Sequence, residues 1–390
     1  MAGQLAAVVG VGQTERYKAK VKESIAGLVR EAALKALEDA GCGWDDIDAV
    51  IIGKAPDFFE GHLMPELYLA DALGCVGKPM IRVHTAGSVG GSTAIVAASH
   101  IQSGQFKRVL TVAYEKQSES NAMWALSSKQ PFSPHFNAGA GGFFAPIIRE
   151  YMRRSGAPAD IGCKVAYKDR MHALNNSHAH IQDEHGKPDL EQYLASPMLW
   201  DPIRFSEVCP SSDGACAMVI ANEELAEASP NPPAWIAGTA MRSEPTMYAW
   251  REEVNPEAGR QCAADVYAQA GITNPLQEID CAEVYVPFSW YEPMWLENLG
   301  FAEEGKGWQL TMDGVTDNNN GGSCPWNPSG GVLCSNPIGA SGMIRFAEAA
   351  RQVRGDAGAH QVDGAKTALG HAYGGGAQFF AMWIVGAEKP

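Results

Sequence analysis

The feature of this 390-residue chain that most constrains its fold is a weak internal repeat. The first copy begins with an apolar strand at residues 5–10. Residues 24–40 follow with apolar side chains at helical spacing, and Gly41 stands where such a helix would end. A turn then leads into a second apolar strand at residues 45–52. This alternation predicts an α/β fold in which helices cover sheets of parallel type.

The second half of the chain repeats this order. Residues 233–238 form an apolar strand, and residues 259–271 form a helix-like segment that ends in glycine. Residues 278–285 repeat the turn and the second strand. The two copies predict two halves of a βαβαβαββ type, stacked as layers of helices and mixed sheets.

Each half continues with a turn rich in glycine and serine, at residues 85–93 and at residues 336–343. A helix of small residues is expected after each turn, and then another strand. We match the strand at residues 108–114 with the one at residues 378–385.

The repeat also sets the expected domain boundaries, residues 1–230 for the N-terminal half and 231–390 for the C-terminal half. The stretch from about residue 115 to 200 has no counterpart in the second half, so we interpret it as an insertion over the first half. Long insertions in α/β proteins usually shape a site.

Charge and composition argue against several classes of protein. A net charge of −15 at pH 7 disfavours a generic nucleic-acid binder, which needs a basic surface. The sequence contains no run of 18 apolar residues, so it predicts no membrane-spanning helix. The nine cysteines are scattered without a Cys-x-x-Cys pair, which indicates reduced thiols in a cytoplasmic protein and no metal site. We interpret His178, His180 and His185 as part of a solvated loop rather than a metal site.

Residues 82–94 are the most informative local sequence. The helix expected at residues 89–103 is small or apolar on most sides, so it is predicted to be buried. Its N-terminus would then point into the protein with Ser88 at its start, which suits a nucleophile or an oxyanion site. The alternative is that the glycines of this turn only allow close helix packing.

Three second-half segments would meet this turn if the halves stack face to face. They are residues 283–290, residues 327–342 and residues 369–377. Their glycines would let a thioester or a phosphate approach the backbone.

Together these segments resemble the thiolase superfamily, and within it the sterol-carrier-type thiolases and the thiolase-like steroid side-chain-CoA aldolases. The resemblance covers essentially the whole chain and rests on five motifs in order. They are Gly87-Ser-Val-Gly-Gly-Ser-Thr-Ala94, Pro210-Ser-Ser-Asp-Gly-Ala215, and residues 283–289, 327–342 and 372–376.

The departures from the family pattern define the expected chemistry. Ser88 stands at the position of the nucleophilic cysteine, Asn336 at that of a histidine, and Ala372 at that of the acid/base cysteine. Tyr285 replaces the histidine or asparagine of the third motif. With no thiolate and no base beside Ser88, ordinary thiolase chemistry is not expected. The backbone N–H donors of the glycine turns would still stabilise a thioester enolate.

The resemblance to the steroid aldolases implies that Tyr285 and Tyr373 are the catalytic residues of a retro-aldol cleavage. One takes the proton from the β-hydroxyl and the other returns a proton to the α-carbon; which does which stays open. A basic tyrosine needs a positive environment or hydrogen-bond donors that favour phenolate. His371 would tune the site and Tyr291 is a spare candidate. We interpret residues 290–295 as an aromatic wall for a flat apolar ligand.

The implied enzyme is a lyase that cleaves a β-hydroxyacyl-CoA with a steroid or bile-acid side chain, and that releases a short acyl-CoA and a steroid ketone or aldehyde. The CoA thioester is the substrate and no cofactor is implied. The residues expected to contact the substrate or the enolate are Ser88, His371, Asn336, Gly374 and Gly375.

Two other functions stay open, an acyltransferase that uses Ser88 as nucleophile and a non-catalytic carrier of lipid or acyl-CoA. The resemblance also implies a homodimer formed through the first-half sheet. It further implies a separate small protein with an OB-fold and a zinc ribbon, which would complete a heterotetramer.

Overall fold

The computed structural model describes residues 4–55, 59–121, 139–182, 187–246 and 251–390. Within these ranges nine strands form one mixed sheet, in the order β3-β2-β4-β7-β1-β8-β11-β10-β9. The strands are β1 (Ala6–Gln13), β2 (Ala49–Gly53), β3 (Met80–Val83), β4 (Arg108–Lys116), β7 (Asp213–Asn222), β8 (Ala234–Ser243), β9 (Cys281–Glu283), β10 (Thr367–Gly374) and β11 (Phe379–Gly386). A separate small hairpin consists of β5 (Met198–Trp200) and β6 (Ile203–Arg204).

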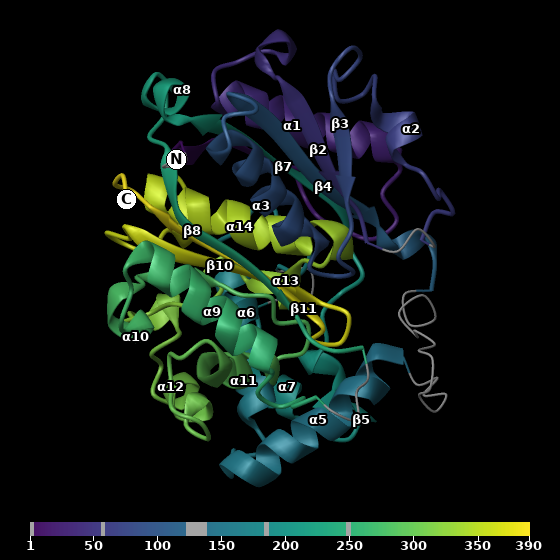
Figure 1. Ribbon diagram of the computed structural model, residues 1–390. Coiled ribbons are helices and arrows are strands. Elements are labelled where there is room, and N and C mark those ends of the chain that lie inside the picture. Colours follow the sequence, from purple (N-terminus) through teal and green to yellow (C-terminus); the bar gives the residue numbers. More distant parts are fainter. Residues whose placement is uncertain (1–3, 56–58, 122–138, 183–186, 247–250) are drawn as a thin grey trace.

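The helices cover both faces of this sheet (Figure 1). They are α1 (Ile25–Asp39), α2 (Glu66–Leu69), α3 (Val89–Gln102), α5 (Gly139–Ser155), α6 (Ile161–Ala173), α7 (Leu190–Leu194), α8 (Glu223–Glu227), α9 (Glu257–Ala270), α10 (Pro275–Glu278), α11 (Tyr291–Asn298), α12 (Gly307–Met312), α13 (Gly331–Cys334) and α14 (Ile338–Arg354).

The two parts of the sheet join through a short antiparallel pairing of β1 with β8, in which Ala7 faces Trp235 and Val8 faces Ala234. Helices α3 and α14 lie side by side between the two parts (Figure 1). Helix α1 covers the outer face of the first part and α9 the outer face of the second. The predicted α/β fold of stacked helices and mixed sheets is confirmed.

The predicted helix ends follow from their capping residues. Ser24 precedes α1 and accepts a hydrogen bond from the Gly27 N–H at 3.1 Å, which satisfies a free donor of the first turn. Helix α9 ends at Gly271, whose φ of 71° lies in the left-handed region that glycine adopts without strain. Helix α3 is buried on nearly every side, as its composition predicts.

The match between the two halves is shifted by one strand from the prediction. Strand β4 pairs parallel with β2 and antiparallel with β7, and β10 pairs parallel with β9 and antiparallel with β11. The counterpart of β4 is therefore β10, and the expected match of residues 108–114 with residues 378–385 is wrong. Strand β10 is hard to recognise because it contains glycines. A side chain at Gly370 would lie 2.6 Å from the Trp383 ring nitrogen, so this glycine makes room for the tryptophan.

Helix α5 of the 115–200 stretch packs against the second half, while His178 of the same stretch contacts Thr14 of the first half, so the interpretation as an insertion over the first half covers only part of it. The Phe144 ring on α5 lies 5.3 Å from both Phe288 and Tyr291. The Tyr151 hydroxyl donates a 2.8 Å hydrogen bond to Glu297. This stretch therefore covers the aromatic core behind the second-half site.

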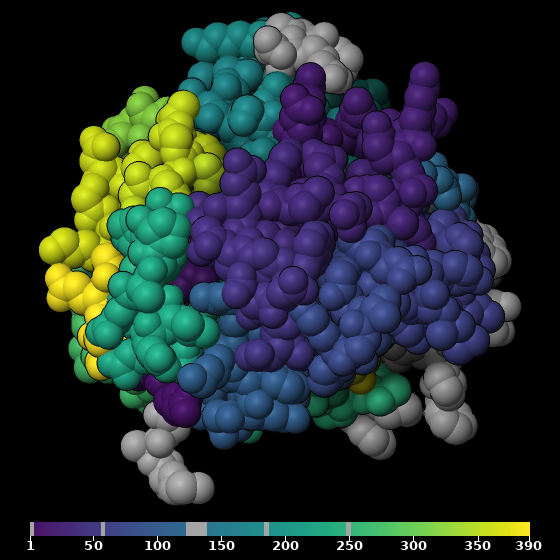
Figure 2. All heavy atoms as spheres, turned by 90° about the horizontal axis from the view of Figure 1, so that it is seen from above, coloured from purple at the N-terminus to yellow at the C-terminus, as the bar shows by residue number. Residues whose placement is uncertain are grey.

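Seen from above, residues of the first half cover most of the surface (Figure 2). Strand β3 is the edge strand, and several large apolar side chains near it are exposed. They are Leu63, Met64, Leu67, Tyr68 and Val76. Among the helices in the described ranges, none combines the length and the apolar character that crossing a bilayer requires.

Candidate active site

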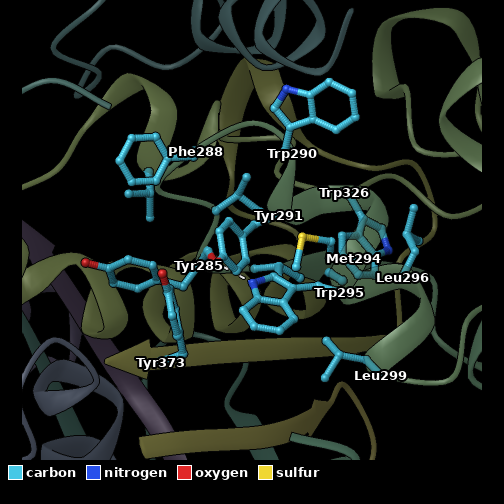
Figure 3. Close-up of a cluster of buried hydrophobic side chains, with 14 of the residues drawn as sticks. Tyr285, Phe288, Trp290, Tyr291, Met294, Trp295, Leu296, Leu299, Trp326 and Tyr373 are labelled. Atoms are coloured by element: carbon cyan, nitrogen blue, oxygen red, sulfur yellow. Dashed lines mark hydrogen bonds between the residues drawn. The ribbon is translucent and has the colours of Figure 1, made fainter. Parts of the chain in front are cut away.

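Two tyrosines meet at the carboxyl ends of neighbouring strands. Tyr285 follows β9, Tyr373 is the next-to-last residue of β10, and these strands run parallel. Their ring centroids lie 5.3 Å apart at an interplanar angle of 80°. Both hydroxyls lie on the same side of the aromatic cluster (Figure 3). The parallel register therefore brings together the two residues to which the resemblance assigns the proton transfer.

The turn before α3 touches this pair through its backbone. A side chain at Gly374 would place its Cβ 2.4 Å from the backbone nitrogens of Gly87 and Ser88, so the two turns are in direct backbone contact. A Cβ at Gly87 would lie 3.9 Å from the Tyr285 hydroxyl and 3.3 Å from the Tyr373 carbonyl oxygen. Only glycine allows this close approach.

Asn336 links the second-half turn to Tyr285. Its side-chain oxygen Oδ1 accepts a 2.7 Å hydrogen bond from the Ser341 hydroxyl and lies 3.4 Å from the Tyr285 hydroxyl, which donates to it. Its Nδ2 donates to the Cys209 sulfur at 3.2 Å. Its backbone N–H donates to the Ser212 hydroxyl at 3.0 Å. Asn336 is therefore held by four groups from three segments of the chain.

Ser88 is buried, but its polar groups are engaged locally. The hydroxyl donates to the Thr85 carbonyl oxygen at 2.7 Å and lies 3.0 Å from the Thr85 hydroxyl. The Ser88 backbone N–H donates to the same carbonyl at 3.3 Å. Both the hydroxyl and the N–H of Ser88 are therefore bonded within the turn.

The two tyrosines are neutral phenols. Burial, and next the Cys209 thiol, raise the pKa of Tyr285 well above its ordinary value. Burial, and next Tyr291 and Tyr285, raise the pKa of Tyr373 in the same direction. The largest effect on both tyrosine pKa values is thus desolvation, and not the positive environment that a basic tyrosine needs.

His371 lies beside the tyrosines and is also neutral. Its Nδ1 accepts a 3.3 Å hydrogen bond from the Tyr285 backbone N–H, and its ring stacks parallel to Tyr373 at 6.4 Å. Burial lowers the pKa of His371 to about 3. In the described part of the chain, its Nε2 is buried without a hydrogen-bond partner. His371 therefore helps to fix the backbone of Tyr285 and carries no charge at neutral pH.

The glycine turn after β10 needs its glycines for their backbone conformation. Gly375 and Gly376 have φ values of 66° and 64°. They connect β10 to β11 as a hairpin, and the Gly376 carbonyl accepts a 2.8 Å hydrogen bond from Arg251. This turn therefore leads into a strand, not into a helix.

A buried ion pair anchors the fourth motif under the tyrosines. Glu283 pairs with Arg345 and accepts hydrogen bonds from the Ser329 N–H at 3.0 Å and the Ser329 hydroxyl at 2.9 Å. The Asn327 side chain accepts a 2.8 Å hydrogen bond from the Val284 N–H. These contacts hold residues 327–331 against β9 and so fix the place of Tyr285.

The expected aromatic wall is part of the core. Trp290 and Trp295 are fully buried, and the Trp295 ring nitrogen donates to the Tyr285 carbonyl at 3.0 Å. Tyr291 is also fully buried and its ring stacks on Tyr373 at 5.8 Å (Figure 3). The interpretation of residues 290–295 as a ligand wall is therefore wrong, because these rings pack under the tyrosines instead of facing a ligand.

Sequence reasoning missed two residues that the structure places in the site, Cys209 and Ser341. Burial raises the pKa of the Cys209 thiol to about 12, so it is neutral and not a nucleophile. A signal for each was present, because Cys209 directly precedes Pro210 of the second motif and Ser341 lies inside the fourth.

The described ranges hold no group of three or more His, Cys, Asp or Glu side chains that could bind a metal ion. His178 contacts the Thr14 carbonyl at 2.9 Å, and His180 contacts the Ser212 hydroxyl at 2.8 Å. His185 lies outside the described residues.

Residues 240–387 match a family model described as thiolase C-terminal domain-like. The chain is 30% identical to human sterol carrier protein 2, over 97% of this chain and 72% of that protein. It is also 30% identical to an acetyl-CoA acetyltransferase of Methanothermobacter thermautotrophicus, over 95% of this chain and 96% of that one.

A solved structure, the Ltp2-ChsH2(DUF35) aldolase, superposes on this fold with a TM-score of 0.84. The two sequences are 27% identical, and the match covers 99% of this chain and 98% of the other. The similarity thus extends over both parts of the sheet and over every motif of the site.

Proposed function

This chain belongs to the thiolase superfamily, and from that premise we propose that it is a carbon–carbon lyase acting on a 3-hydroxyacyl-CoA by a retro-aldol reaction. One observation carries the proposal. Tyr285 and Tyr373 meet at the Gly87 turn, where the family's nucleophilic cysteine is replaced by a serine that is engaged with Thr85.

The proposed reaction breaks the bond between the α- and β-carbons of the substrate. The β-hydroxyl gives up its proton as its oxygen becomes the carbonyl of the ketone or aldehyde product. The bonding electron pair passes to the α-carbon and the thioester as an enolate, and the α-carbon then takes up one proton. Because one proton leaves and one is added, the reaction balances with the CoA thioester as sole substrate and we propose no cofactor.

Neutral phenols suit a proton relay. One tyrosine hydroxyl would accept the β-hydroxyl proton as it passes its own proton to the other tyrosine, which delivers its proton to the α-carbon, so no phenolate has to exist in the buried site. Backbone N–H groups of the Ser88 turn and of Gly374 and Gly375 would hold the enolate oxygen. For Ser88 this means that its N–H exchanges the 3.3 Å bond to Thr85 for the oxyanion.

The proposed substrate carries a steroid or bile-acid side chain. Similarity over nearly the full chain to a solved aldolase supports the lyase reaction, and similarity to sterol carrier protein 2 supports a sterol-like apolar group. The products would be a short acyl-CoA and a steroid ketone or aldehyde.

We further propose a homodimer that also binds a separate small OB-fold, zinc-ribbon protein to give a heterotetramer. The edge strand β3 and the exposed side chains of Leu63, Leu67 and Val76 offer a surface for the second copy. The solved aldolase is a complex of Ltp2 with ChsH2(DUF35), which supports a second protein of that kind here.

We do not propose acyl transfer through Ser88. Its hydroxyl contacts only Thr85 among the described residues, and threonine is no general base. A non-catalytic carrier differs from the lyase in an observable way: it would bind acyl-CoA without turnover and would tolerate removal of both phenolic hydroxyls.

The test is release of a short acyl-CoA from a 3-hydroxyacyl-CoA with a steroid side chain. The chain is co-expressed with its zinc-ribbon partner, so that a missing subunit does not mask activity. We expect short acyl-CoA and steroid carbonyl product in equal amounts. Binding of the thioester without cleavage, in the presence of the partner, would rule out the lyase and favour the carrier.

A further inference from the structure

We propose that Ser341 and Cys209 are positioning residues that hold the Asn336 carboxamide in one orientation and thereby keep Tyr285 as the hydroxyl that delivers the last proton of the relay. This inference rests on the proposed lyase function. It assigns different tasks to the two tyrosines and adds two residues to the machinery of the reaction.

The two ends of the Asn336 carboxamide have different partners. The oxygen Oδ1 accepts from the Ser341 hydroxyl at 2.7 Å, while the nitrogen Nδ2 donates to the Cys209 sulfur at 3.2 Å. A hydroxyl is a good donor, and a thiol sulfur accepts only weakly and donates only weakly. Reversing the amide would exchange the short O–H···O bond for weaker contacts, so the observed orientation is the favoured one.

The backbone around Asn336 is fixed as well. Its N–H donates to the Ser212 hydroxyl at 3.0 Å, and its carbonyl accepts from the Ser212 N–H at 3.2 Å. The side chain is 4% exposed and that of Ser341 is fully buried, so water does not compete for these groups. The remaining freedom of the residue is rotation of its amide, which is what Ser341 and Cys209 restrict.

This orientation turns a hydrogen-bond acceptor toward Tyr285. The phenol donates to Oδ1 at 3.4 Å, and an acceptor stabilises the protonated phenol over the phenolate. With the amide reversed, Nδ2 would face the same oxygen as a donor and would stabilise the phenolate instead. The observed amide orientation therefore adds to the preference of Tyr285 for the protonated state, which burial sets first.

Tyr373 differs from Tyr285 in this respect. Among the described residues its hydroxyl makes no hydrogen bond, and we assign it to the substrate. In the relay, Tyr373 would receive the β-hydroxyl proton as it passes its own proton to Tyr285, and Tyr285 would pass its proton to the α-carbon. One proton thus moves from the β-oxygen to the α-carbon, and each phenol ends as it began.

Other ionisable groups also face Tyr285 and must be included in any pH experiment. They are Cys209 before β7, Glu115 on β4, Arg345 on α14, and His371 and Tyr373 on β10. Negative charge on Cys209 or Glu115 raises the pKa of Tyr285, while Arg345 and the Ser341 hydrogen bond lower it. A change confined to the amide should be separable from these by the choice of variant.

The experiment compares Ser341→Ala, Cys209→Ala and Cys209→Ser in the partner-bound enzyme, with steady-state kinetics across pH. We expect Ser341→Ala to lower kcat about tenfold at every pH tested, with KM within about twofold. Cys209→Ala should act in the same direction, and Cys209→Ser, which keeps an acceptor for Nδ2, should restore kcat to within about threefold.

Two controls distinguish orientation from folding. Ser99→Ala removes a hydroxyl that bonds only the Ile95 carbonyl four residues earlier, as Ser341 also does toward Pro337, and should leave kcat unchanged. In an Asn336→Ala background, Ser341→Ala should add less than about a twofold effect, because the amide it orients is absent. If Ser341→Ala does not fold, the Cys209 pair gives the same comparison from the other end of the amide.

The inference and the proposed function fail in different ways. If Tyr285→Phe abolishes cleavage while Ser341→Ala and Cys209→Ala keep the wild-type kcat and pH profile, the orienting role is overturned and the lyase stands. An additive effect of Ser341→Ala in the Asn336→Ala background overturns it equally. If Tyr285→Phe is fully active, both the orienting role and the proposed task of Tyr285 are overturned.

Discussion

The turns that start α3 and α14 occupy equivalent places in the two halves, yet their polar groups serve different ends. At α3, the Ser88 hydroxyl and N–H both engage Thr85, only three residues earlier. At α14, Ser341 donates to the Asn336 side-chain oxygen, which in turn accepts from Tyr285 after β9. Ser88 of the first-half turn bonds within its own turn, whereas Asn336 of the second-half turn accepts a hydrogen bond from Tyr285.

The two halves of the repeated fold thus contribute different groups to the proposed site. The first half contributes a backbone that approaches the site, since Gly87 and Gly374 touch without side chains between them. The second half contributes the phenols, Asn336 and Ser341, and Cys209 of the first half contacts the Asn336 amide. The proposed reaction therefore needs no nucleophile in the first half, because backbone donors for a thioester enolate do not depend on a side chain.

Removal of a phenolic hydroxyl should have the largest effect on turnover. Tyr373→Phe should lower kcat for cleavage by about 10²-fold or more, because it removes a proton-transfer group and leaves the packing of the ring intact. Release of short acyl-CoA is the measurement. Equal turnover of the variant and the wild-type enzyme would remove the second half from the proposed chemistry.

The backbone contact between the halves gives the next largest effect. Gly374→Ala places a Cβ 2.4 Å from the nitrogens of Gly87 and Ser88, so the turns must separate, at a cost of about 1–3 kcal/mol in the free energy of unfolding.

The matched control for this change is Gly386→Ala at the other end of the same hairpin, where the nearest atom would be 3.4 Å away. Denaturant unfolding and kcat should both fall for the first variant and stay near wild type for the second. Equal behaviour of the two would mean that the close approach of the turns is unimportant.

The neutral state of His371 predicts how the free energy of unfolding depends on pH. Burial lowers its folded-state pKa to about 3, so between that value and about 6.5 the unfolded chain binds the proton and the folded chain does not. Stability therefore rises with pH in this window, by up to about 1.4 kcal/mol per unit for this group. His371→Asn should flatten the slope measured by denaturant unfolding between pH 4 and 7. An unchanged slope would contradict the buried neutral state.

Ser88 should give the smallest effect. Ser88→Ala removes one buried hydrogen bond to Thr85, with a cost of about 1 kcal/mol in stability and a kcat within about threefold of wild type. The same lyase assay reports it. A loss as large as that of Tyr373→Phe would mean that the first-half turn supplies a reacting side chain after all.

Much of the scaffold was predictable because the signals are local. Helices α1 and α9 follow from apolar spacing and from the glycines after their last turns. The approach of Tyr285 to the Gly87 turn follows from the order of the motifs. Strand β10 did not follow, since its glycines read as a loop and only the pairing with β9 and β11 makes it a strand.

The contacts that define the site were harder to predict because they join distant parts of the chain. Cys209 and Asn336 are 127 residues apart, and nothing local in either segment indicates that the sulfur meets the amide. Whether the Trp295 ring faces a ligand or the core likewise depends on which segments cover it. Helix α5 of the inserted stretch lies on the same core. Sequence pattern gives the residue types, and the packing of the halves decides their neighbours.

The most direct measurement is turnover of a steroid 3-hydroxyacyl-CoA in heavy water, with mass spectrometry of both the released short acyl-CoA and the quenched enzyme. We expect one deuterium on the α-carbon of the product, delivered through the exchangeable phenols, and an enzyme of unchanged mass. An acyl group on the peptide that contains Ser88 would contradict it.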